Sequence, residues 1–220
     1  MDQDFFGDMC RPTMARPLLG LTVLVVEDSR YACDAMQLMC IRSGARIRRA
    51  DCLASARRHL AVYRPSAVIV DMGLPDGSGA DLLSEMRIAS PRVSVILATS
   101  GDPFAEKVAI AAGADGFLAK PLASLAAFQN AILAELPPDR RPNGPRSVET
   151  VEIAPDPVAY RDDLAHAADL LDPLPEGAEV DYVARFLSGV ARSAEDTALG
   201  PPVARLRHLL AERLTERIAI

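Results

Sequence analysis

Five side chains that could do chemistry stand at the ends of apolar, strand-like segments. Asp71 ends the segment VIVD, and Glu27 and Asp28 follow the segment LTVLVV. Thr99 and Lys120 close two later apolar segments. Because the carboxyl ends of parallel strands meet at one edge of a sheet, where ligands bind, we expect all five side chains to converge there.

These residue types suit the transfer of a phosphoryl group. Three carboxylates close together repel one another, and a hard cation such as Mg²⁺, which prefers oxygen ligands, relieves the repulsion. A lysine and a hydroxyl both suit phosphoryl oxygens, and Asp71 is the candidate nucleophile that would form an aspartyl phosphate. Alone, Asp71 would be interpreted as a turn-capping residue, and its four companions favour the chemical role.

The elements that must position these side chains alternate between strand and helix. The predicted strands are 21–26, 46–50, the run ending at 71, 93–98 and 116–119, and the predicted helices are 29–44, 53–62, 81–88, 103–112 and 122–136. Ser29 is the predicted N-cap of the first helix, and Gly44 is its predicted stop. The alternation predicts an α/β fold, a doubly wound five-stranded parallel sheet with helices on both faces.

Composition divides the chain into four parts. They are an N-terminal arm (1–19), the α/β domain (20–136), a linker with six prolines (137–157) and a helical module (158–220). The module is predicted to be all-α, with three helices at 158–171, 180–199 and 203–218. A core of this size often needs a partner, and the apolar stripe of the last helix is the predicted dimerisation surface.

Charge and cysteine usage restrict the class of protein. The net charge of −6 arises after residue 150, where 13 acidic residues stand against 7 arginines and no lysine. Because DNA-binding surfaces are basic, we do not expect DNA as a partner of this third. Cys10, Cys33, Cys40 and Cys52 lack the spacing of a zinc site, so we interpret them as reduced thiols in the cytoplasm. No run approaches the ~20 apolar residues of a membrane span.

Four segments together resemble the receiver domain of two-component response regulators. They are VLVVED, VIVDMGLPDGSG, ILATSG and AGADGFLAKP, in the order and spacing of that family. Each alone is a weak signal, whereas the four in succession are specific. The resemblance implies a flavodoxin-like fold over about 21–136 and a signalling switch rather than an enzyme, with Asp71 accepting phosphate from a histidine kinase or a histidine phosphotransfer protein.

The resemblance also implies a role for each strand-end residue. The implied Mg²⁺ ligands are Glu27, Asp28, Asp71 and the backbone carbonyl of Gly73. The implied residues for phosphate binding and switching are Thr99, Lys120 and Phe117, and Pro121 would follow Lys120 through a cis bond. Phosphate on Asp71 would draw Thr99 inward and let Phe117 turn, which reshapes the face around the last strand.

Two departures from the family pattern concern the site. Glu27 replaces the commoner aspartate and lengthens one arm toward the metal. The segment from Thr99 to Gly113 is about one residue shorter than usual, so Ser100 is the alternative switch hydroxyl. We assign the role to Thr99 because it follows the strand directly.

The output of the helical module stays open. Its acidity favours a protein-interaction or dimerisation module, and the alternative is a transcriptional regulator with an atypical DNA-binding domain. An enzyme of the haloacid dehalogenase kind also uses a strand-end Asp with Mg²⁺, but that family's second acid is absent at Gly73. His166 and His208 are interpreted as surface histidines rather than phosphotransfer sites.

Six arginines cluster around the first two predicted helices. They are Arg42, Arg46, Arg48, Arg49, Arg57 and Arg58. They form either a solvated face or a surface that steers an acidic phosphodonor toward the site.

Overall fold

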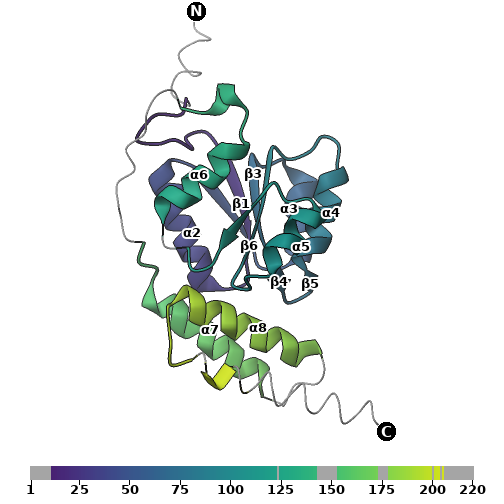
Figure 1. The fold of residues 1–220 in the computed structure, drawn as a ribbon, viewed down its shortest axis with the longest axis vertical. Helices are drawn as coiled ribbons and strands as arrows, with labels where there is room; N and C mark the ends of the chain where they lie inside the picture. The colour runs from purple at the N-terminus through teal and green to yellow at the C-terminus, as the bar shows by residue number, and fades with distance from the viewer. Residues whose placement is uncertain are drawn as a thin grey trace, which may run out of the picture.

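A computed structural model of the chain places residues 11–122, 124–142, 153–172, 178–199, 201–203 and 205. Five strands form its centre: β1 (Thr22–Val26), β2 (Arg46–Ala50), β3 (Ala67–Asp71), β6 (Val95–Ser100) and β7 (Gly116–Ala119). They pair in parallel in the order β2-β1-β3-β6-β7 (Figure 1). The predicted five-stranded parallel sheet is confirmed.

Helices cover both faces of the sheet, as predicted. One face carries α2 (Arg30–Ser43) and α6 (Leu125–Glu135), and the other carries α3 (Leu53–Val62), α4 (Gly79–Ile88) and α5 (Ala105–Ala112) (Figure 1). Alternate residues of β3 explain this double cover. Ile69 belongs to the apolar cluster with Phe128 of α6, whereas Val68 and Val70 belong to the cluster with Leu83 of α4.

The first helix begins and ends where its sequence predicts. The Ser29 hydroxyl accepts a hydrogen bond from the Ala32 backbone N–H at 3.0 Å, which caps the start of α2. Gly44 adopts φ 83° in the left-handed region, and its N–H donates to the carbonyls of Cys40 and Ile41. Only glycine takes this conformation without strain, so the helix stops here and the chain turns into β2.

Three short segments were not anticipated from the sequence. A short hairpin follows β3 and consists of two strands of two residues each, β4 (Gly73–Leu74) and β5 (Gly77–Ser78). One 3₁₀ turn (Pro138–Arg140) lies in the proline-rich segment. Leu18, within the predicted N-terminal arm, is fully buried in the core, and its N–H donates to the Ser43 carbonyl at 2.9 Å. The arm therefore contributes to the core at this position.

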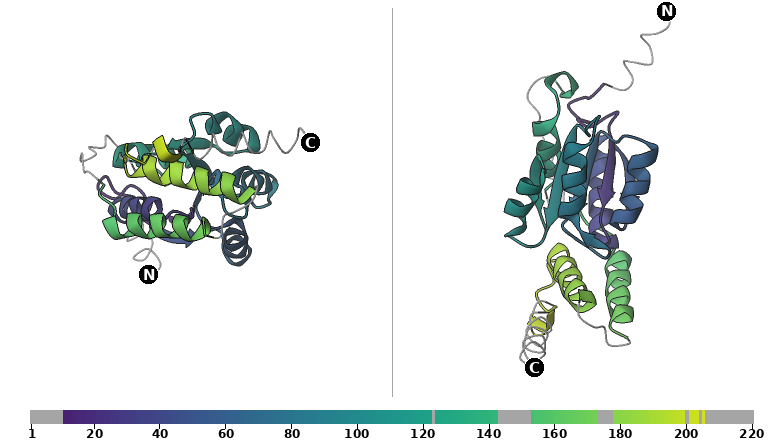
Figure 2. Two further views of the ribbon diagram at one scale, coloured as in Figure 1. Left: turned by 90° about the horizontal axis from the view of Figure 1, so that it is seen from below. Right: turned by 90° about the vertical axis from the view of Figure 1, so that its right-hand side faces the viewer.

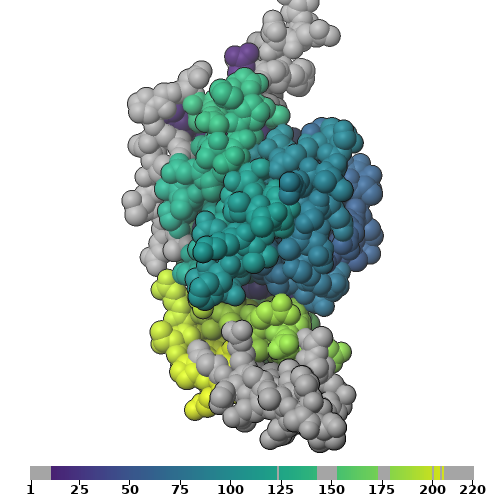
Figure 3. Space-filling view, turned by 45° about the vertical axis from the view of Figure 1, so that its right-hand side comes forward, coloured from purple at the N-terminus to yellow at the C-terminus, as the bar shows by residue number. Residues whose placement is uncertain are grey.

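Two further helices lie below the sheet, α7 (Pro157–Leu170) and α8 (Ala178–Ser193). They run side by side beneath the carboxyl-terminal edge of the strands (Figures 1 and 2). Their shared apolar cluster contains Ala167 of α7 and Val183, Phe186 and Val190 of α8. From the side shown in Figure 3, residues of the C-terminal third pack directly under the surface of the α/β domain.

The helix α8 ends earlier than the predicted limit of residue 199. Glu195 turns the chain out of the helix with φ 52°, and the Asp196 carboxylate accepts hydrogen bonds from the backbone N–H groups of Ala198 and Leu199. The third predicted helix, 203–218, falls almost entirely outside the described residues.

Candidate functional site

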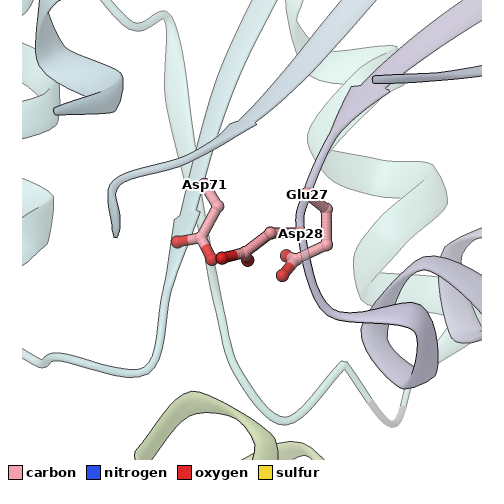
Figure 4. Close-up of side chains that lie close together, drawn as sticks. All are labelled: Glu27, Asp28 and Asp71. Carbon is pink, nitrogen blue, oxygen red and sulfur yellow. The ribbon is translucent and has the colours of Figure 1, made fainter. Parts of the chain in front are cut away.

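Three predicted carboxylates meet at the carboxyl-terminal edge of the sheet. Glu27 and Asp28 follow β1 directly, and Asp71 is the last residue of β3, the strand beside β1. One oxygen of each carboxylate lies within 4.8 Å of the others. In Figure 4 the side chains extend into the space between the two strand ends. The fold thus brings Asp71 close to Glu27 and Asp28, which precede it by 44 and 43 positions in the sequence.

Lys120 is the cation of this cluster. It follows β7, and its Nζ lies 2.7 Å from Asp71 Oδ2 and 2.6 Å from Glu27 Oε2. Lys120, Glu27 and Asp71 are all buried, so both ion pairs lie away from solvent. A desolvated lysine within 2.7 Å of two carboxylates fits the phosphate-binding role that the resemblance implies for Lys120.

The charges of the cluster are not balanced. Burial, together with the nearby Asp71 carboxylate, raises the pKa of Glu27 well above its ordinary value and the pKa of Asp28 to about 6. Burial lowers the pKa of Lys120, but the carboxylates of Asp71 and Glu27 outweigh it, so the pKa of Lys120 is raised. Three carboxylates share one lysine, and a further positive charge would stabilise their ionised forms.

The donor set of the cluster fits Mg²⁺. All three side chains offer carboxylate oxygens, the ligand type that this hard cation prefers. The raised pKa values of Glu27 and Asp28 show the same need for an added cation from the side of the protein. Gly73 borders the same cleft, and its N–H donates to Asp71 Oδ1 at 3.2 Å.

Glycine is required where α4 begins behind Asp71. A Cβ atom at Gly79 would lie 2.1 Å from the carbonyl oxygen of Asp71, which no side chain tolerates. The Gly79 N–H instead donates to the carbonyl of Met72 at 3.2 Å. The glycine-rich loop therefore lets the helix start against the backbone that carries the candidate phosphoacceptor.

The two candidate switch hydroxyls lie in different surroundings. Thr99 pairs in register with Asp71, is fully buried, and donates its hydroxyl hydrogen to the Leu118 carbonyl at 2.8 Å. Ser100 is half-buried and lines the cleft beside the carboxylates. The Thr99 hydroxyl must therefore rotate to reach a group on Asp71, whereas Ser100 faces the cleft already.

Phe117 and Pro121 flank the strand end that carries Lys120. Phe117 is half-buried against the apolar cluster under α3, α4 and α5. The bond between Lys120 and Pro121 is cis, as the resemblance implied.

Helix α8 forms one wall of a cleft over the site, a feature that sequence reasoning missed. The cleft has a volume of about 510 Å³ and is bordered by the carboxylates and Lys120 on one side and by Arg185, Gly189 and Arg192 on the other. The Tyr182 hydroxyl donates a hydrogen bond to Asp28 Oδ2 at 2.6 Å. Burial and the Asp28 carboxylate raise the pKa of Tyr182, which keeps its hydroxyl protonated.

Helix α7 is anchored beside the site by one buried carboxylate. Asp163 is 2% exposed and accepts hydrogen bonds from the Ser29 hydroxyl at 2.7 Å, the Arg30 N–H at 2.8 Å and the Tyr31 N–H at 3.1 Å. It thus caps the start of α2 from another part of the chain. The spacing of Ala159, Asp163 and Ala167 at four-residue steps is the signal that could have placed Asp163 on the buried face.

Other candidates lie outside the cluster. His166 is exposed, and its ring contacts Phe186 edge-on at 5.7 Å, while His208 lies outside the described residues. The six arginines around α2 and α3 are exposed, and two of them form ion pairs, Arg49 with Asp34 and Arg57 with Glu85. Among the described residues, no helix is long and apolar enough to cross a membrane.

Two relatives of the chain are named as regulators. The response regulator MprA of Mycobacterium sp. (strain KMS) is 30% identical over 143 residues, which are 64% of this chain and 62% of MprA. The KDP operon transcriptional regulatory protein KdpE of Escherichia coli (strain K12) is 30% identical over 99 residues, 45% of this chain and 44% of KdpE. The chain therefore spans less than two thirds of the length of either relative.

The name of KdpE does not support our expectation that DNA is absent from the partners. That expectation used the net charge of the last third of the chain. Net charge averages over a segment, whereas a DNA contact needs only a local group of basic side chains. Residues 205–217 hold four arginines, which the average conceals.

A solved receiver domain and a family profile each match about half of the chain. The receiver domain of the sensor histidine kinase PA1611 from Pseudomonas aeruginosa PAO1, solved with a magnesium ion coordinated in its active site cleft, is 24% identical. It covers 52% of this chain and 96% of that domain, with a TM-score of 0.47. The family described as the response regulator receiver domain matches residues 23–132, half of the chain. The chain therefore belongs to the response regulator receiver-domain family.

Proposed function

We propose that this chain is a two-component response regulator that accepts a phosphoryl group on Asp71 from a histidine kinase or a histidine phosphotransfer protein. One observation carries the proposal: the Asp71 carboxylate lies at the sheet edge, 2.7 Å from Lys120 Nζ and beside the acidic pair Glu27 and Asp28. A carboxylate nucleophile, a fixed cation and an oxygen-ligand cluster are the parts that phosphoryl transfer needs.

In the proposed reaction, an oxygen of Asp71 attacks the phosphorus atom of a phosphohistidine. The new P–O bond forms as the P–N bond breaks, and the imidazole leaves with the electron pair of that bond. Lys120 pairs with the oxygens of the transferred group. Glu27, Asp28, Asp71 and the Gly73 carbonyl would hold Mg²⁺, which neutralises phosphoryl charge when bound.

The proposed signal is a shift between two arrangements of Thr99 and Phe117. The Thr99 hydroxyl, which donates to the Leu118 carbonyl, would exchange that partner for an oxygen of the phosphoryl group. Phe117 is only half-buried and would turn into the space that Thr99 leaves. Both changes act on β7 and so on the face that β7 shares with its neighbouring helices.

For the output, the relatives favour transcriptional regulation. KdpE carries that description, and its match with this chain is confined to 44% of its length. A salt-dependent shift of duplex DNA by the full chain would support this output. The placement of α8 beside the phosphorylation cleft favours the second candidate, a helical module that binds a protein partner or a second copy of the chain.

The proposal describes a switch rather than an enzyme, and it places the chain in the cytoplasm. Cys33, Cys40 and Cys52 are free thiols among the described residues, and burial raises the pKa of Cys33 and of Cys40 to about 12. Free, unreactive thiols are usual in the reducing conditions of that compartment.

The replacement Asp71→Asn tests the proposal. Incubation of the full chain with acetyl phosphate and Mg²⁺ is expected to add one phosphoryl group, detected by intact mass and removed by hydroxylamine. Asp71→Asn should abolish the addition and leave the circular dichroism spectrum unchanged, because the amide keeps the shape of the side chain without a nucleophilic oxygen anion. Asp102→Asn, at the exposed rim of the same cleft, serves as the matched control and should be labelled like the wild type. Undiminished labelling of Asp71→Asn refutes the assignment.

A further inference from the structure

Helix α8 contacts the site through one of its candidate metal ligands. Tyr182 donates its hydroxyl hydrogen to Asp28 Oδ2 at 2.6 Å, across 154 positions of sequence. A carboxylate oxygen that accepts a short hydrogen bond from a phenol has less electron density to offer a cation. The Tyr182 ring is also fixed in place, because it lies 6.0 Å from the ring of Phe186 in the buried cluster of the module.

The same helix brings positive charge to the cleft. Arg185 and Arg192 both border it from the same face of the helix, about two turns apart, with Gly189 between them. The helix lies close to the loop after β6, because a Cβ atom at Gly101 would lie 3.3 Å from Arg192 Cδ and 3.7 Å from Gly189 Cα. Two arginines facing an acidic cluster partly meet the need for charge that a divalent cation would otherwise meet.

Helix α7 holds this arrangement in register. The Asp163 carboxylate is tied to the first turn of α2, directly after Asp28, and Tyr160 of α7 packs edge-on against Tyr31 of α2 at 5.7 Å. The module therefore approaches the cluster from two sides, and α8 lies over the cleft itself.

We propose that α8 is an intramolecular competitor of the divalent cation, with Tyr182 as the positioning residue that holds Asp28 in its cation-free arrangement. The inference rests on the proposed function, since it assumes that Glu27, Asp28 and Asp71 bind Mg²⁺. Cation binding at Asp28 displaces the Tyr182 hydroxyl and places two positive charges opposite Arg185 and Arg192. Both effects weaken the docking of α8 on the receiver domain.

Thermodynamic linkage makes this competition reciprocal. If the docked helix lowers the affinity for Mg²⁺ by some factor, then bound Mg²⁺ lowers the stability of the docked helix by the same factor. The competition can therefore be measured through the affinity for Mg²⁺ and through the stability of the docked helix, and neither measurement requires phosphorylation.

The first measurement is the dissociation constant of Mg²⁺ by titration calorimetry on the full chain. Tyr182→Phe removes the hydroxyl and keeps the ring, and it should lower the dissociation constant about tenfold, the effect expected for loss of one hydrogen bond to a charged group. Tyr160→Phe is the matched control, because it removes a hydroxyl that donates to Asp196 at 2.6 Å within the same module. Its dissociation constant should equal that of the wild type.

The second measurement is amide hydrogen exchange of residues 178–193 in the wild type. Saturating Mg²⁺ should speed exchange in α8 by a comparable factor and leave β3 protected. An unchanged or higher dissociation constant in Tyr182→Phe, or unchanged exchange in α8, overturns the inference while the phosphoacceptor assignment stands. Absence of Mg²⁺ binding in the wild type and in both variants instead overturns the metal site, and the inference with it.

Discussion

The carboxylates at the sheet edge and the carboxylate of Asp163 differ in how their charge is compensated. At the sheet edge, three carboxylates share Lys120, and the pKa values of two of them are raised. Asp163 stands alone and accepts three hydrogen bonds from the first turn of α2. The comparison separates a cluster that needs a ligand from a contact that is complete and holds two parts of the chain together.

The largest effect in this comparison is expected at Lys120. Lys120→Met leaves Asp71 and Glu27 buried without a counter-charge, and loss of one partner of a buried ion pair costs about 3–5 kcal/mol. We expect urea unfolding of the full chain to report a loss of that size. Added Mg²⁺ should restore part of it, because the cation replaces the missing positive charge.

Lys107→Met is the control for this change, since Lys107 is exposed on α5 and is the other lysine of the chain. It should alter the free energy of unfolding by less than about 0.5 kcal/mol. If the two variants were equally stable, the charge balance described for the sheet edge would be wrong.

A smaller effect is expected at Asp163. Asp163→Asn keeps the shape of the side chain but replaces one carboxylate oxygen with an N–H₂ group, which cannot accept hydrogen bonds from the start of α2. Leaving a buried donor unsatisfied costs about 1–3 kcal/mol. The thermal unfolding midpoint should fall, and hydrogen exchange in α7 should rise. Asp162→Asn is the matched control, because the Asp162 carboxylate pairs with Arg30 on the exposed surface at 2.7 Å. An exposed pair contributes about 0–1 kcal/mol, so a larger loss at Asp162 than at Asp163 contradicts this comparison.

The sheet edge could be predicted from the sequence because its signals are local. A Val- and Ile-rich run followed by an acid or a lysine marks a strand end, and parallel topology then collects the strand ends at one edge. Asp71, Asp28 and Lys120 come together for this reason. The rotation of the Thr99 hydroxyl toward the Leu118 carbonyl carries no such signal, because it depends on a single torsion angle.

The docking of the module could not be predicted in the same way. The apolar stripe with Val183, Phe186 and Val190 correctly indicated a buried face of α8. Such a stripe does not identify the surface against which the helix packs. Tyr182 and Asp163 each act through contacts more than 130 positions away. A carboxylate on a helix is usually exposed, so the type of residue at position 163 does not predict a buried contact with α2.

The most direct test of the account is whether α8 lies on the receiver domain in solution. Gly101 and Gly189 suit a cross-link, because a Cβ at position 101 would lie 3.7 Å from Gly189 Cα and a Cβ at position 189 would meet no atom within 4 Å. Mild oxidation of the Gly101→Cys, Gly189→Cys double variant should give an intramolecular disulfide between these positions, identified by peptide mass and absent from both single variants. If the two cysteines stay reduced in the folded monomer, α8 does not cover the phosphorylation cleft, and the coupling between the two regions is wrong.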